Sequence, residues 1–259
     1  MAVHKVETLE VSEKSNFKSP VAAFNGLPLR AADAISTLVG YQVYADDFLI
    51  YTGPNTAGEA GGWLLTEVAA GGGNTGRVDI DDSKQFGYLK LKTDNGTADE
   101  EVLEMNGEPW RYVVGKKLWF FTKFQVDDVD KVLLLLGLAI SDTAPLAAVT
   151  DGLYFRKASA AVTALEAVAE KNSVEAASTN LITITDNVDV IVGFVVDSAG
   201  AITIYGGASL AAMTVIDSLP AGNACIPDDE DLHLSINLQT SETTAHSMSI
   251  DWIIIGQER

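Results

Sequence analysis

The chain has 259 residues, of which 47% are hydrophobic, so it is long and apolar enough to bury the core of one large domain. It carries 36 aspartates and glutamates against 17 lysines and arginines, a formal net charge of −19, and such a surface repels nucleic-acid phosphates and anionic membranes. The composition thus argues against nucleic-acid and membrane partners, and the single cysteine, Cys225, excludes an intrachain disulfide.

Residues 1–45 differ from the rest of the chain and are predicted to form an N-terminal arm. Apolar residues between Leu29 and Leu38 recur at helical spacing, and Gly40 is typical of a helix end, which predicts a short helix. A leading strand followed by a loop is the alternative. The first residues carry charges and no continuous apolar run, so we expect no secretory signal peptide and assembly in the cytoplasm.

Residues 46–259 are predicted to form one β domain. Short apolar runs at 48–52, 63–70 and 86–93 are separated by glycine-rich loops, which is typical of strands and their connections. The glycine-rich loop at 71–76 lacks the lysine and the following helix of a phosphate-binding loop. We therefore interpret it as a hairpin connection.

The centre of the chain is predicted to form two strands that meet at an acidic turn. Residues 118–126 alternate in their second half, and residues 132–140 are apolar on both faces, which is typical of a strand covered on two sides. Because the turn at 127–131 is short, we expect the two strands to pair antiparallel. Residues 161–171 fit a helix or a strand, and we favour the strand.

The last hundred residues repeat short strands and turn signals at close spacing, a rhythm typical of a sandwich. Apolar and polar residues alternate strictly over 232–239, so we expect one buried face and one wet face. Alternate residues from His246 to Ile254 are predicted to share a face. The sequence therefore predicts an all-β fold, an antiparallel β-sandwich preceded by the arm.

The chain offers little material for a metal or nucleophilic site. Its three histidines, His4, His233 and His246, lack HxxH or HxH spacing. The last two become neighbours if their strands pair around residues 240–245, and two separate surface residues are the simpler interpretation. No GxSxG sequence occurs, and Ser209 lacks the strand-to-helix elbow of a nucleophile. We expect no catalytic residue, no metal and no cofactor.

Paired carboxylates are the remaining catalytic option, because most glycosidases use two of them. Asp79, Asp81 and Asp82 have suitable spacing, but their surroundings lack the apolar residues that raise the pKa of an acid. Glu101 and Glu104 are three residues apart in a segment that we interpret as loop-like. A non-enzymatic protein is the simpler interpretation.

Acidic turns and tryptophans leave two binding alternatives. Residues 128–131 and 227–231 supply the oxygen ligands that Ca²⁺ prefers, but neither forms an EF-hand loop, and solvated turns are favoured. The tryptophans could stack on sugar rings, although packing in the core is the commoner role of a tryptophan in a strand. They are Trp63, Trp110, Trp119 and Trp252.

Four blocks of sequence carry a resemblance to a known family. They are LWFFTKFQVDDVDKVLLLLGLAISDTAP (118–145), TDGLYFRK (150–157), VDVIVGFVVDSAGAITIYGG (188–207) and SMSIDWIIIGQER (247–259). In order and spacing they resemble a family of tailed-phage virion proteins that have concanavalin-like jelly-roll domains. The resemblance extends over residues 85–259, and it implies an antiparallel sandwich of the concanavalin type.

The resemblance further implies a non-enzymatic structural protein that decorates or cements the capsid shell. Its partners would be the major capsid protein and other copies of itself, as a homotrimer by analogy with other shell-decorating proteins. It would reside on the virion surface after assembly in the host cytoplasm. A strongly acidic exterior suits this role, because mutual repulsion keeps free copies soluble.

The N-terminal arm is the expected contact with the shell or with a neighbouring subunit, because an extended segment can add a strand to an exposed sheet edge. The alternative function is a lectin-like carbohydrate-binding module on the virion or in the host-recognition apparatus, and weak glycan binding is compatible with both functions. The candidate contact residues of the arm are Phe17, Phe24, Leu27 and Pro28.

Overall fold

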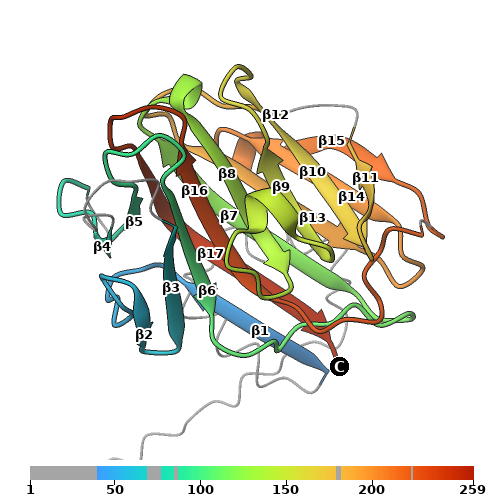
Figure 1. Cartoon of the computed structure of the whole chain (residues 1–259). Helices are drawn as coiled ribbons and strands as arrows, with labels where there is room; N and C mark the ends of the chain where they lie inside the picture. Colours follow the sequence, from blue (N-terminus) through green and yellow to red (C-terminus); the bar gives the residue numbers. More distant parts are fainter. Residues whose placement is uncertain (1–39, 69–76, 85–86, 179–181, 223) are drawn as a thin grey trace, which may run out of the picture.

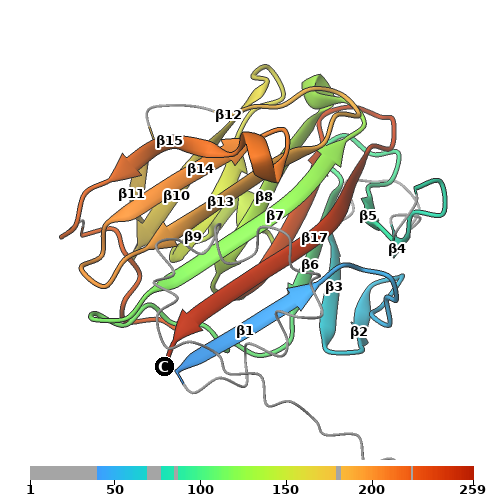
Figure 2. The same cartoon turned by 180° about the vertical axis from the view of Figure 1, so that it is seen from behind.

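The computed structural model describes residues 40–68, 77–84, 87–178, 182–222 and 224–259. These residues form two antiparallel β-sheets that pack face to face, as Figures 1 and 2 show from opposite sides. The predicted all-β antiparallel sandwich is confirmed. Within the described ranges, no helix is long and apolar enough to cross a membrane.

The first sheet has eight strands and is held together by the C-terminal strand β17. On one side β17 pairs with β7, and on the other side it pairs first with β5 and then with β1. The strands, in sheet order, are β15 (Thr214–Leu219), β14 (Ile202–Gly207), β13 (Val190–Val196), β7 (Leu118–Val126), β17 (Ser247–Glu258), β5 (Leu89–Lys92) and β4 (Arg77–Ile80), with β1 (Tyr41–Asp46) beside β17.

The second sheet has nine strands, with β8 and β16 near its middle. The strands, in sheet order, are β11 (Val174–Ala177), β10 (Ala164–Lys171), β9 (Gly152–Lys157), β8 (Val132–Ala139), β16 (His233–Thr240), β6 (Glu100–Met105), β3 (Trp63–Val68) and β2 (Gly58–Ala60), with β12 (Ile182–Thr183) beside β10. The short helical turns are η1 (Val129–Lys131), α3 (Pro145–Ala148) and η2 (Leu210–Ala212).

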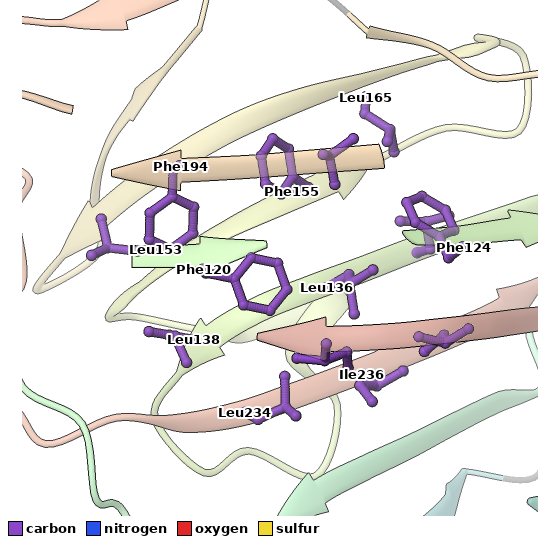
Figure 3. Packing of buried hydrophobic residues seen from close by; sticks show 14 of the residues in the cluster. Phe120, Phe124, Leu136, Leu138, Leu153, Phe155, Leu165, Phe194, Leu234 and Ile236 are labelled. Atoms are coloured by element: carbon purple, nitrogen blue, oxygen red, sulfur yellow. The ribbon is translucent and has the colours of Figure 1, made fainter. Parts of the chain in front are cut away.

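The core lies between the two sheets, because each strand turns alternate side chains inward. Phe120 and Phe194 from the first sheet meet Phe155 from the second (Figure 3). The rings of Phe120 and Phe194 stack with their centroids 5.6 Å apart. Aliphatic residues such as Leu136 and Ile236 fill the space beside them.

One expectation about the centre of the chain is wrong: β7 and β8 do not pair. They belong to opposite sheets, and the acidic turn with η1 carries the chain across the end of the sandwich. Asp186 fixes this crossing by accepting a hydrogen bond from the backbone N–H of Val129 at 2.7 Å. A short turn can therefore join two sheets as well as two neighbours in one sheet.

Two further strand predictions need correction. Residues 48–52 are not a strand, because β1 ends at Asp46, whose carboxylate accepts a hydrogen bond from Phe48 N at 2.8 Å and turns the chain. In β17 a bulge shifts the register between Ile250 and Trp252, so that Ile253 takes the core face instead of Trp252.

Other predictions have mixed outcomes. The strand favoured over 161–171 is confirmed as β10, Ala164–Lys171. The helix predicted between Leu29 and Leu38 and the hairpin connection at 71–76 lie outside the described residues. The division between arm and sandwich stays a prediction, and the described chain joins the first sheet at Tyr41.

Candidate functional site

A row of polar side chains lies on the outer face of the nine-stranded sheet. On β6, Glu100 and Glu104 point outward, whereas Leu103 belongs to the core between the sheets. On the adjacent β16, Ser235 lies opposite Glu104, and Gln239 lies opposite Glu100. We call Glu100, Glu104, His233, Ser235, Asn237 and Gln239 the polar row.

A segment of the same chain closes the polar row from outside. Residues 140–151, which we call the covering segment, include α3 and pass in front of β8 and β9 in Figure 1. Ser141 Oγ and Asp142 N each donate a hydrogen bond of 3.1 Å to the Glu104 carboxylate. The backbone N–H of Leu146 donates to Glu100. The two glutamates thus attach the covering segment to the sheet.

Apolar contacts anchor the covering segment beside the polar row. Leu146 and Val149 pack against a small cluster on the outer face of β8, β9 and β10. That cluster contains Leu135, Tyr154 and Val168 and is separate from the main core. The outer face of β16 was predicted to be wet, and this is wrong, because the covering segment buries it.

Burial determines the chemistry available to Glu100, which is only 2% exposed. Loss of hydration raises the pKa of this carboxyl, and hydrogen bonds from Asn237, Gln239 and Leu146 reduce the rise without cancelling it. A carboxyl with a raised pKa can serve as a general acid. The covering segment, however, leaves Glu100 almost without solvent-exposed surface.

Glu104 faces a histidine. His233 Nε2 lies 3.0 Å from Glu104 Oε1, and both side chains are almost fully buried. Beside them, Ser235 Oγ and Asn237 Oδ1 are buried without a hydrogen-bond partner among the described residues. The polar row therefore combines two carboxyls, an imidazole and unsatisfied polar atoms in a closed patch.

Glu101 and Glu104, the carboxylate pair considered from the sequence, do not form a site. The segment is the strand β6 and not a loop, and residues three apart on a strand lie on opposite faces. Glu101 points inward and is 1% exposed. Burial, and then the charges of Glu67, Asp99 and Asp94, raise its pKa to about 9.

The acidic triplet at 79–82 lines a surface hollow of about 180 Å³ at the corner of the eight-stranded sheet. Burial alone would raise the pKa of Asp81, but hydrogen bonds from Ser83 and Ser249 and the charge of Lys90 outweigh it and lower the pKa. A depressed pKa suits an ion-pairing group and not a general acid. The hollow is lined by Arg77, Asp79, Ile80, Asp81, Asp82, Lys90 and Lys92.

The two acidic turns considered for calcium have protein partners. Asp128 caps η1 by accepting a hydrogen bond from Asp130 N at 3.1 Å. In the segment 227–231, Asp228 and Asp229 both pair with Lys171. Across the described part of the chain, no group of three or more histidine, cysteine or acidic side chains is placed to hold a metal ion.

The structure separates the histidines. His233 lies on β16 in one sheet, and His246 directly precedes β17 in the other, so their strands do not form a hairpin. His246 instead lies between two carboxylates, with Nδ1 3.2 Å from Asp127 and Nε2 3.1 Å from Glu242. His4 lies outside the described residues.

Three of the four tryptophans are buried. Trp63 and Trp110 belong to the core between the sheets, and Trp119 lies on the outer face of the eight-stranded sheet. Trp252 is half-buried beside the bulge of β17. The candidate arm contacts lie outside the described residues; they are Phe17, Phe24, Leu27 and Pro28.

Comparisons with known proteins identify the fold. No protein-family model and no curated protein matches the chain. Among solved structures, a protein of unknown function, SO2946 from Shewanella oneidensis MR-1, is similar at 15% identity with a TM-score of 0.57, covering 90% of this chain and 95% of that one.

A glucanase and a lectin are also similar among the solved structures. An endo-1,3-beta-glucanase from Streptomyces sioyaensis has 11% identity and a TM-score of 0.55, with 85% of this chain and 97% of that chain covered. Peanut lectin has 10% identity and a TM-score of 0.52, with 84% and 97% covered. The chain therefore has the jelly-roll β-sandwich fold of concanavalin-like lectins and glucanases.

Proposed function

We propose that this chain is a non-enzymatic structural protein of a tailed-phage virion that decorates the capsid shell through contacts with the shell and with other copies of itself. The observation that carries the non-enzymatic part is the closure of the polar row. Its carboxyls are the chain's best candidates for acid–base chemistry, and the covering segment removes them from solvent. The virion assignment rests on the sequence resemblance of the four blocks.

Charge distribution supports a surface role. Residues 1–39, the part of the predicted arm that precedes β1, have four acidic and four basic residues, so the whole net charge of −19 belongs to residues 40–259. Repulsion between such bodies keeps free copies apart. Attachment to a shell then depends on uncharged surfaces, on the neutral arm, or on basic patches of the shell.

Mass spectrometry of purified virions tests this proposal. We expect this chain to be present in many copies per particle, in fixed proportion to the major capsid protein. Its absence from virions that are otherwise complete would refute the proposal. A reconstruction of the particle would then locate its density, which we expect on the outer surface of the shell.

A carbohydrate-binding module is the second candidate, and the hollow at the corner of the eight-stranded sheet favours it. The hollow combines acceptors such as Asp79 with donors such as Lys90 and Lys92, a mixture that suits sugar hydroxyls. The lectin among the similar folds is consistent with this use. On a glycan array, binding that is lost in Asp79→Asn and Lys90→Ala and kept in Glu108→Ala would favour it, and no binding would remove it.

A further inference from the structure

The outer face of the eight-stranded sheet is apolar where its central strands meet. Trp119 and Phe121 alternate along β7 with the core residue Phe120, so they point away from the second sheet. Ile191 on β13 and Ile254 on β17 lie on the same outer side. All four are buried, yet they are not members of the core clusters. We call these four residues the aromatic face.

The two rings lie flat on the sheet because their neighbours are glycines. Gly256 is the register partner of Trp119, and a Cβ added to it would lie 2.1 Å from the indole ring. Gly193 is the partner of Phe121, and its added Cβ would lie 2.0 Å from that ring. Each ring thus occupies the space that a side chain on the next strand would fill.

The aromatic face is covered from outside. A ring that lies flat on a sheet keeps its other side open unless something packs against it. Trp119 is nevertheless only 6% exposed and Phe121 only 4%. Tyr41 and Tyr205 flank them, with ring centroids 5.9 Å and 5.7 Å away, respectively. Figure 2 views this side, and no described strand or helix crosses β7 and β17 there.

The position and composition of the N-terminal segment make it the best-suited occupant. The described chain begins at Gly40, next to Tyr41 at the edge of the aromatic face, and Gly40 O accepts a hydrogen bond from Arg259 N. The preceding 39 residues can reach about 130 Å when extended, far more than the face requires. Their equal numbers of acidic and basic residues suit an uncharged surface.

We propose that residues 1–39 pack in cis over the aromatic face, so that the arm covers the sheet of its own subunit. The contact is made by the apolar side chains of the arm, among them Phe17, Phe24 and Leu27. The inference does not depend on the virion assignment, because it concerns the free protein.

Photo-crosslinking in the full-length chain tests the proposal without a truncation. Benzoylphenylalanine replaces Phe17, Phe24 or Leu27, one position at a time, and the products are mapped by mass spectrometry. We expect crosslinks to peptides that contain residues 118–122 or 253–257. Crosslinks only to other parts of the molecule, or none, would overturn the proposal.

Mixed isotopes distinguish the subunit's own arm from that of a second copy. Protein labelled with ¹⁵N is mixed with unlabelled protein under native conditions for long enough to exchange, and then irradiated. Packing in cis gives crosslinked peptide pairs of one isotope only. Pairs that contain both isotopes would show an arm from another copy and would overturn the cis arrangement.

A substitution gives an independent readout. The full-length variant Phe17→Ser, Phe24→Ser, Leu27→Ser should increase acrylamide quenching of tryptophan fluorescence, because Trp119 loses its cover while Trp63 and Trp110 stay in the core. The control is Val162→Ser, which removes an exposed apolar side chain elsewhere. Equal quenching in the arm variant and the control would contradict the proposal.

Discussion

The two outer faces of the sandwich differ in the residues that they present and in how those residues are buried. The nine-stranded sheet turns the polar row outward and closes it with the covering segment through the carboxylates of Glu100 and Glu104. The eight-stranded sheet turns Trp119 and Phe121 outward and lays them over glycines. Both faces are buried, so alternation alone does not distinguish a wet face from a covered one. Directional hydrogen bonds hold the covering segment over the polar row, whereas a cover over the aromatic face depends on complementary shape and on contact area.

The largest effect should come from detaching the covering segment. We expect Glu104→Ala to lower the free energy of unfolding by about 3 kcal/mol, because it leaves His233, Ser141 and the backbone N–H of Asp142 without their buried partner. Hydrogen exchange should increase over residues 141–146. Glu108→Ala is the control, since Glu108 is exposed and lies 4.0 Å from the same histidine. Equal stability of the two variants would show that the carboxylate does not attach the segment.

The next effect tests the apolar face. Gly256→Val places methyl groups where the Trp119 ring lies, and we expect a loss of about 2 kcal/mol in urea unfolding together with a changed near-ultraviolet dichroism signal. Thr203→Val, on the outer side of β14, is the matched control because it adds no atom beneath a ring. A stable Gly256→Val variant with an unchanged tryptophan signal would mean that the ring does not rest on this glycine.

A pH series compares the two sides of β6. Because the folded pKa of Glu101 is raised to about 9, the folded state retains this proton, and the group's contribution to stability is lost as pH rises from its ordinary pKa towards 9. We therefore expect Glu101→Gln to gain about 2 kcal/mol over wild type between pH 5 and pH 6.5, as measured by urea unfolding. Glu100→Gln, on the hydrogen-bonded side, should gain less. Parallel pH profiles for wild type and Glu101→Gln would contradict the expectation.

The smallest effect should come from the charged corner of the eight-stranded sheet. Lys92 lines the surface hollow there, away from the aromatic face, and is partly exposed. We expect Lys92→Ala to change the free energy of unfolding by less than about 0.5 kcal/mol, as for most surface substitutions. Thermal unfolding checks this. A loss as large as that of Gly256→Val would mean that the corner stabilises this sheet as much as the aromatic face does.

The sequence predicts which residues form strands better than it predicts which strands pair. Alternation and apolar runs predict the strands at β8, β10 and β16, because those signals are local. A hairpin and a crossing between two sheets give the same local signals, so the sequence predicts a pairing of β7 with β8 that the structure does not contain. The bulge in β17 inserts one residue and reverses the alternation after it, and no local signal marks that residue.

The candidate site was harder to predict than the fold. The polar positions of β16 are visible in the sequence, but their burial depends on a segment some ninety residues earlier in the chain. For Glu100, the only signal in the sequence is its spacing of four residues from Glu104. The aromatic face could have been suspected from the glycines within apolar strands, because a glycine inside a strand often marks the close approach of another group.

The pairing of β1 with β17 has a consequence for biosynthesis. Tyr41 pairs with Glu258, so the first and last described strands meet only after the residues between them have left the ribosome. Until then the hydrophobic strand β7 has only β13 as a neighbour and keeps an open edge, and such an unpaired edge is prone to aggregation. Folding dominated by such long-range contacts is slow. Electrostatic repulsion between the strongly negative chains then opposes their aggregation during synthesis as well as after folding.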